Sequence, residues 1–77
     1  MILPGSTVRF ARMPEWAAQL PDESRRVFEF CLGRTYRIEE IDPHGLFVLD
    51  VSTDVDTRFG GFRNDIRLEA EFLEEVA

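Results

Sequence analysis

The sequence predicts one small domain, residues 1–77, that is mainly β with five strands and one short α-helix. Segments that alternate between apolar and polar residues indicate strands, and one segment with apolar residues four positions apart indicates the helix. An Asp-Pro-His-Gly sequence indicates a tight turn between two of the strands. We expect these residues to form a single domain, because 77 residues are too few to enclose two hydrophobic cores.

The first strand is predicted at residues 6–12, where Val8 and Phe10 lie on one face of the alternating pattern. Residues 13–20 contain a proline and the isolated Trp16, and they show no sustained period. We expect a loop or a single helical turn there.

The helix is predicted at residues 22–32. Val27 and Cys31 are four positions apart, as are Phe28 and Leu32, so one face of the helix is apolar. A proline precedes this segment and a glycine follows it, which suits the two ends of a helix. We expect Phe28, Cys31 and Leu32 to dock the helix onto the strands.

A hairpin is predicted next, with strands at residues 34–41 and 46–52 joined by a turn at 42–45. Gly45 is expected to adopt a left-handed conformation, because the turn must lead back into the strand ladder. The second of these strands is apolar on both faces, which indicates either a central strand or an outward patch. The outward patch would contain Leu46 and Val48.

The last third of the chain is expected to begin with a polar loop at residues 53–61. A strand follows at residues 62–68, and the tail contains enough apolar residues for one 3₁₀ turn at 70–73 and a short closing strand. The apolar face of the strand is expected to contain Phe62, Ile66 and Leu68.

These elements, with apolar positions at Ile66, Leu68, Leu73 and Val76, resemble a small Src-homology-3-like barrel. In that fold a 3₁₀ turn separates the fourth and fifth strands, as residues 70–73 would here. The resemblance implies a five-stranded barrel with a helix inserted after the first strand. It implies no single function, because such barrels bind peptides, bind RNA or are purely structural.

Two stretches carry a second resemblance, to small bacterial proteins of unassigned function that have a helix after the first strand. They read Gly33-Arg34-Thr35-Tyr36-Arg37-Ile38 and Ile41-Asp42-x-x-Gly45-Leu46. The sequence lacks the acidic, tyrosine-rich segment of proline-binding members of the barrel fold, and Tyr36 is its only tyrosine. Proline-peptide binding is therefore not implied.

The charged residues are distributed unevenly. Residues 1–37 contain six arginines and four acidic residues, whereas residues 38–77 contain three arginines and eleven acidic residues. A net charge of −6 disfavours nucleic-acid binding, which depends on neutralising phosphates. A basic or mixed-charge protein partner fits the acidic half, although solubility alone would explain the same surplus. All nine basic residues are arginine, which indicates a GC-rich genome and, second, a preference for bidentate contacts.

No apolar run approaches the length of a membrane span, so we expect a soluble, cytoplasmic protein without a membrane partner.

The sequence also offers no convincing catalytic set. His44 is expected to be a solvated turn residue, and Cys31, the only cysteine, a small hydrophobic core residue. The acidic run at 50–56 lacks the glycine and glutamate of a calcium loop, and Gly60-Gly61 lacks the lysine of a phosphate loop. We expect no metal, no cofactor and no enzymatic activity unless a partner chain completes a site.

The leading hypothesis is a non-catalytic protein-interaction or adaptor module that binds an unidentified protein or a second copy of itself. Its expected contact surface combines apolar residues at the centre with acidic residues at the rim that attract a basic partner. Its members are Trp16, Leu46, Val48, Phe59, Asp54 and Asp56. Trp16 has a second interpretation, as a lid that closes the hydrophobic core.

The alternative is a small RNA-binding barrel that uses the arginine-rich first half. Tyr36 would serve as its stacking platform, as aromatic residues do in proteins that bind single strands. The arginines involved would be Arg9, Arg12, Arg34 and Arg37.

Overall fold

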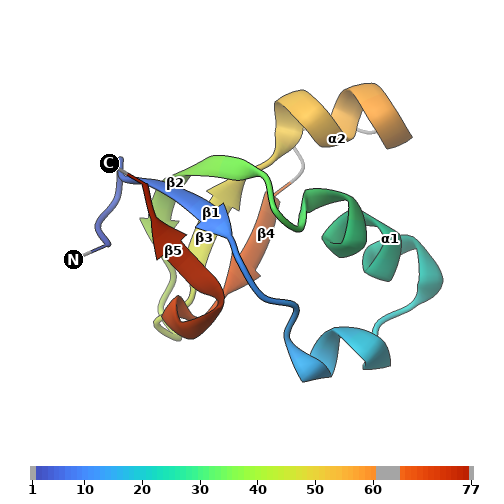
Figure 1. The fold of residues 1–77 in the computed structure, drawn as a ribbon, viewed down its shortest axis with the longest axis horizontal. Helices are drawn as coiled ribbons and strands as arrows, with labels where there is room; N and C mark the ends of the chain where they lie inside the picture. Colours follow the sequence, from blue (N-terminus) through green and yellow to red (C-terminus); the bar gives the residue numbers. More distant parts are fainter. Residues whose placement is uncertain (1, 61–64, 77) are drawn as a thin grey trace.

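A computed structural model describes residues 2–60 and 65–76. It contains a five-stranded antiparallel sheet, with two α-helices and two 3₁₀ helices, η1 and η2 (Figure 1). About 37% of the described chain is helical and 31% is in strands, so the expected five strands are present, but a second α-helix and the larger share of helix were not expected. In chain order the elements are β1 (Thr7–Phe10), η1 (Glu15–Gln19), α1 (Asp22–Cys31), β2 (Thr35–Ile41), β3 (Phe47–Asp50), α2 (Ser52–Phe59), β4 (Asp65–Leu68), η2 (Ala70–Phe72) and β5 (Leu73–Glu75).

The strands lie in the order β4-β3-β2-β1-β5. Strand β1 pairs with both β2 and β5, so the chain returns at its end to its first strand. Five strands, the early helix and the 3₁₀ turn before the last strand are confirmed. The predicted start of the fourth strand, at Phe62, lies outside the described residues.

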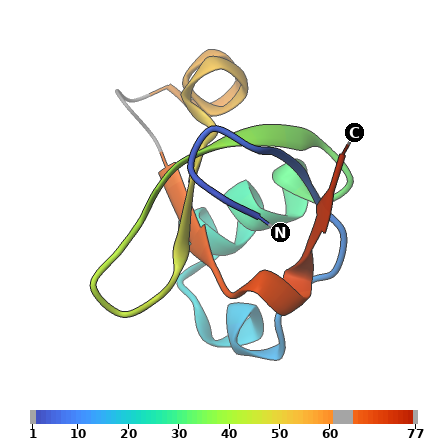
Figure 2. The same ribbon diagram turned by 90° about the vertical axis from the view of Figure 1, so that its left-hand side faces the viewer.

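The core is formed by the inward faces of the strands and by residues from both α-helices. The strands curve around it, and α1 lies at one end of the curved sheet (Figures 1 and 2). The largest fully buried strand residues are Phe10, Ile38, Leu49, Leu68 and Val8.

Helix α1 agrees with its prediction to within one residue and buries Phe28 and Cys31. Leu32 does not dock: it is 41% exposed, which contradicts the expected role. The helix ends at Cys31, and Leu32 has left the helical conformation, so it no longer lies on the buried face. Gly33 has a φ of 85° and redirects the chain toward β2.

Helix α2 occupies most of the segment that was expected to be a polar loop, so that expectation is wrong. Asp50 precedes it, and its Oδ1 accepts hydrogen bonds from the Ser52 backbone N–H (3.1 Å) and hydroxyl (2.6 Å). Val55 is buried against the core, and Gly60, with a φ of 80°, follows the last turn. Burial of Val55 and the Asp50 hydrogen bonds compensate for a sequence rich in poor helix formers.

The hairpin between β2 and β3 has the predicted turn. The Gly45 N–H donates to the Asp42 carbonyl oxygen (2.9 Å), and Gly45 has a φ of 83°, as expected. Within β3, however, Val48 is only 1% exposed, so its expected place on an outward patch is wrong. Strand β3 lies between β2 and β4, and of its two interpretations the central strand is the correct one.

Among the described residues, no helix has both the length and the apolar character needed to cross a membrane.

Candidate functional site

A shallow groove lies where α2 packs beside α1. Phe30 of α1 and four residues of α2 line it: Thr53, Asp54, Thr57 and Arg58. The ring of Phe59 contacts the ring of Phe30 edge to face, with centroids 5.5 Å apart. We refer to this feature as the α1–α2 groove. Its floor is aromatic and its walls are polar.

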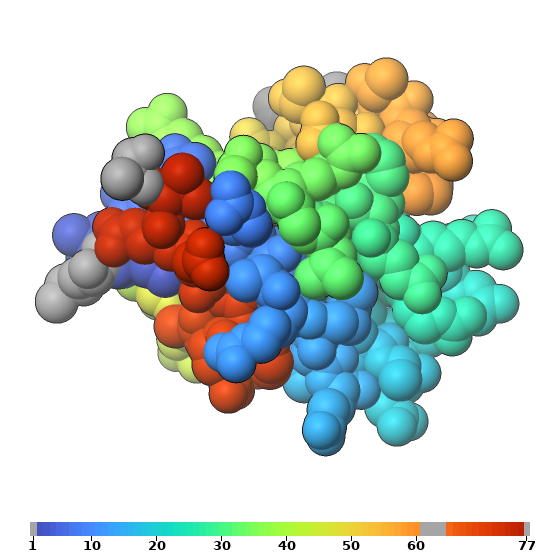
Figure 3. Space-filling view, in the orientation of Figure 1, coloured from blue at the N-terminus to red at the C-terminus, as the bar shows by residue number. Residues whose placement is uncertain are grey.

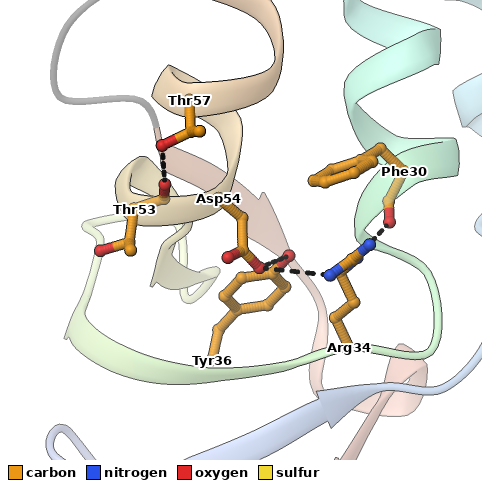
Figure 4. Close-up of polar contacts among 6 residues, drawn as sticks. All are labelled: Phe30, Arg34, Tyr36, Thr53, Asp54 and Thr57. Carbon is orange, nitrogen blue, oxygen red and sulfur yellow. Dashed lines mark hydrogen bonds and ion pairs between the residues drawn. The ribbon is translucent and has the colours of Figure 1, made fainter.

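A polar network links the groove to β2 (Figure 4). The Tyr36 hydroxyl donates a hydrogen bond to Asp54 Oδ2 (3.1 Å), and the same oxygen lies 3.8 Å from Arg34 Nη1. Arg34 Nε in turn donates to the Phe30 carbonyl oxygen (3.0 Å), and its guanidinium lies 4.1 Å from the centroid of the Phe30 ring. Arg34 thereby joins the aromatic floor to the carboxylate.

Two buried groups that can ionise lie at this site: Tyr36, which belongs to the network, and Cys31. Burial raises the pKa of the Cys31 thiol, and burial, with the nearby Cys31 and Asp54, also raises the pKa of the Tyr36 phenol. Both groups are therefore protonated at neutral pH, and Tyr36 remains a hydrogen-bond donor to Asp54. The prediction that Cys31 is a core residue is confirmed, because it has no exposed surface.

The outer wall of the groove belongs to α2. The Thr57 hydroxyl donates to the Thr53 carbonyl oxygen (2.8 Å), which directs this side chain back onto its own helix. Phe59 at the end of α2 is 44% exposed, and the Arg58 guanidinium lies 5.8 Å from its ring centroid. An exposed aromatic ring beside cationic side chains is typical of an interaction surface.

The structure separates the predicted contact residues. Asp54 and Phe59 lie together at the α1–α2 groove, and the half-buried Asp56 lies on the same helix. Trp16 belongs to η1, which lies at the opposite end of the molecule from α2 in both ribbon views (Figures 1 and 2). Leu46 is half-buried and Val48 is buried. No single surface of the kind expected from the sequence therefore forms.

Sequence reasoning missed Phe30, Arg34, Thr53, Thr57 and Arg58 as groove residues. One signal was present: Asp54 and Arg58 are four positions apart, which places them on one face if the segment is helical. Because the segment was interpreted as a loop, this spacing was not used to place the two residues on one face.

Tyr36 cannot act as the stacking platform of the RNA-binding alternative, since it is only 7% exposed and its hydroxyl bonds to Asp54. Three of the four proposed arginines are engaged within the chain. Arg34 lies beside Asp54 and donates to the Phe30 carbonyl oxygen, as described above. Arg9 pairs with Glu74 (3.2 Å), and Arg12 donates to the Glu71 carbonyl oxygen.

In residues 2–60 and 65–76, no three His, Cys, Asp or Glu side chains are arranged to hold a metal ion. His44 is exposed at the turn, as predicted. The acidic run at 50–56, which overlaps the expected polar loop, instead spans the end of β3 and the start of α2.

Comparisons of this chain with protein-family models, with curated proteins and with solved structures give no match.

Proposed function

We propose that this protein is a non-catalytic interaction module that binds a segment of another protein in the α1–α2 groove. The observation that carries the proposal is the exposed Phe59 ring, which extends the aromatic floor formed by Phe30 to the surface. Interaction surfaces commonly combine an aromatic centre with a charged rim. Here Arg34, Arg58 and Asp54 supply the rim.

The rim favours an apolar anchor on the partner over a basic one. Asp54 was expected to attract a basic partner, but its carboxylate already lies beside Arg34 and accepts from Tyr36. Arg58 lies over an aromatic ring and has no acidic partner among the described residues. An aliphatic or aromatic side chain placed on the exposed part of Phe59 would bury apolar surface, while the Arg34 guanidinium stays over the Phe30 ring.

We also propose that the sheet is a Src-homology-3-like barrel. The pairing of β1 with β5, the strand order and the 3₁₀ turn before β5 support this proposal. In such a scaffold, the α1–α2 groove would be a site added to a rigid barrel by its inserted helices.

The test compares proteins captured by the wild type, by Phe59→Ala and by Leu3→Ala. Leu3 is 51% exposed and belongs to the N-terminal segment, so its variant removes a similar apolar side chain from another surface. We expect the wild type and Leu3→Ala to retain the same partner, and Phe59→Ala to lose it. Equal capture by all three proteins would contradict the proposed site.

Titration with mixed-sequence RNA at low salt tests the alternative function. We expect no binding, because the chain carries a net charge of −6 and Tyr36 is buried. RNA affinity that falls steeply as salt is added would replace the proposed function with the alternative.

A further inference from the structure

A second groove lies between η1 and η2, at the end of the molecule opposite α2. Figure 3 shows the blue surface that leads into η1 directly beside the orange-red surface around η2. Main-chain hydrogen bonds hold the segment that leads into η1 against η2. The N–H groups of Ala11 and Arg12 both donate to the Phe72 carbonyl oxygen (2.9 and 3.3 Å). The apolar residues that line this groove are Met13, Trp16 and Phe72.

Trp16 is held in one orientation. Its indole Nε1 donates to Glu69 Oε2 (3.2 Å), and its ring meets the Phe28 ring edge to face, with centroids 5.6 Å apart. The side chain nevertheless remains 36% exposed. Trp16 therefore closes the core at Phe28, as one interpretation of the sequence expected, and also offers aromatic surface to the groove. An indole fixed in this way loses little conformational freedom when a ligand binds.

The charge of this groove is negative. Glu15, Glu69 and Glu71 line it, against one cation, Arg12. The guanidinium of Arg12 donates to the Glu71 carbonyl oxygen, which ties it to the main chain of η2. An exposed indole surrounded by carboxylates is suited to an organic cation, since the aromatic face and the negative charges both attract it.

We propose that the η1–η2 groove binds a lysine or arginine side chain of a basic peptide segment in a partner protein. Trp16 supplies the face on which the cation stacks, and Glu15 and Glu71 neutralise its charge. A second copy of this chain is a poor occupant, because each copy carries a net charge of −6. The site is separate from the α1–α2 groove, so the two proposals can fail independently.

Trp16 also provides the measurement, because it is the only tryptophan in the chain. When the intact protein is titrated with a penta-arginine peptide, Trp16 fluorescence is expected to change and then reach a plateau as the site saturates. The double variant Glu15→Gln/Glu71→Gln is expected to bind about tenfold more weakly. A variant of the same net charge, Glu23→Gln/Glu29→Gln, alters two exposed residues of α1 outside the groove and is expected to bind within about twofold of the wild type.

A labelled penta-arginine peptide, followed by anisotropy, extends the test to variants of the tryptophan. Trp16→Phe is expected to weaken binding several-fold because phenylalanine attracts cations less strongly, and Phe59→Ala is expected to leave it unchanged. Circular dichroism melting verifies that each variant folds. The proposal is overturned if fluorescence does not saturate, if both double variants weaken binding equally, or if Trp16→Phe binds as the wild type does. A penta-glutamate peptide that binds equally well would overturn it too.

Discussion

Asp42 organises the turn between β2 and β3 with its side chain. Asp42 Oδ1 accepts hydrogen bonds from the backbone N–H groups of His44 and Leu46, both at 2.9 Å. Asp42 Oδ2 lies 3.1 Å from Arg67 Nη1 of β4. An aspartate at the first position of the turn was predicted, but its burial and its link to a third strand were not.

These contacts make the free energy of unfolding depend on pH in the acidic range. The hydrogen bond from Leu46 N–H is the largest influence that lowers the pKa of Asp42, followed by His44 N–H and Arg67, while burial opposes them. A lowered folded-state pKa means that this stabilisation is complete above the ordinary Asp value of 3.8 and is lost as pH falls through the folded-state value. We expect the free energy of unfolding, measured with urea, to decrease over this acidic range.

The matched variant for this prediction is Asp42→Asn, which should show a shallower acidic decrease than the wild type. Some decrease will remain, because the Ser52 hydroxyl and N–H lower the pKa of Asp50 as well. Identical pH profiles for the wild type and Asp42→Asn would show that Asp42 does not contribute.

Substitutions at Gly45 measure backbone strain without a change in side-chain packing. Its φ is 83°, and a Cβ added there would meet no atom within 4 Å. Gly45→Val should therefore destabilise the protein by about 1 kcal/mol or more through its backbone conformation alone. Gly45→Asn should cost less, because asparagine tolerates the left-handed region. Chemical denaturation that ranks the two variants in the reverse order would refute this explanation.

At the scale of secondary-structure elements, Phe28 fastens α1 to the sheet. Its ring meets Phe10 of β1 at a centroid distance of 6.1 Å and Trp16 of η1 at 5.6 Å, both edge to face. Phe28→Ala should lower the free energy of unfolding by about 3 to 5 kcal/mol. Leu32→Ala removes an exposed side chain at the end of the same helix and should cost under about 1 kcal/mol. Equal melting temperatures for Phe28→Ala and the wild type would exclude this helix from the core.

Tyr36 fastens α2 in a different way, through the hydrogen bond from its hydroxyl to Asp54. Tyr36→Phe should destabilise the protein by about 1 kcal/mol, which is typical of one hydrogen bond. Amide exchange should accelerate mainly in α2, since the ring stays packed while the link to β2 is removed. Uniform acceleration over the whole chain would instead indicate a general loss of core packing.

The two α-helices show what the sequence could predict and what it could not. Helix α1 follows from local signals, namely the four-residue spacing of Val27 and Cys31 and of Phe28 and Leu32, and the glycine after the helix. Helix α2 contains threonine, valine and aspartate, which are weak helix formers, and it depends on burial of Val55. A contact between elements distant in the sequence decides its structure. The same holds for the α1–α2 groove, whose lining residues belong to two separate helices.

The positions of the strands were predicted well, because alternation is a strong local signal. The exposure of individual strand residues was predicted less well. Val48 was placed on a possible outward patch because it alternates with the residues of the other strand face, whereas its burial depends on which strands flank β3. Both faces of a central strand can be covered. Strand order, and not the alternating pattern, determines whether such a residue is available for binding.

At the scale of the whole molecule, net charge helps to decide whether the α1–α2 groove binds a second copy of the chain or another protein. Two copies with a net charge of −6 repel each other, and of the two groove rings only Phe59 is exposed, at 44%, while Phe30 is half-buried. We expect a monomer at every concentration in a sedimentation series at physiological salt. Phe59→Glu, which replaces a surface side chain and leaves the core intact, should sediment identically. A dimer that strengthens with added salt and is lost in Phe59→Glu would contradict this prediction and assign the α1–α2 groove to a second copy of the chain, because salt screens the repulsion while the apolar contact persists.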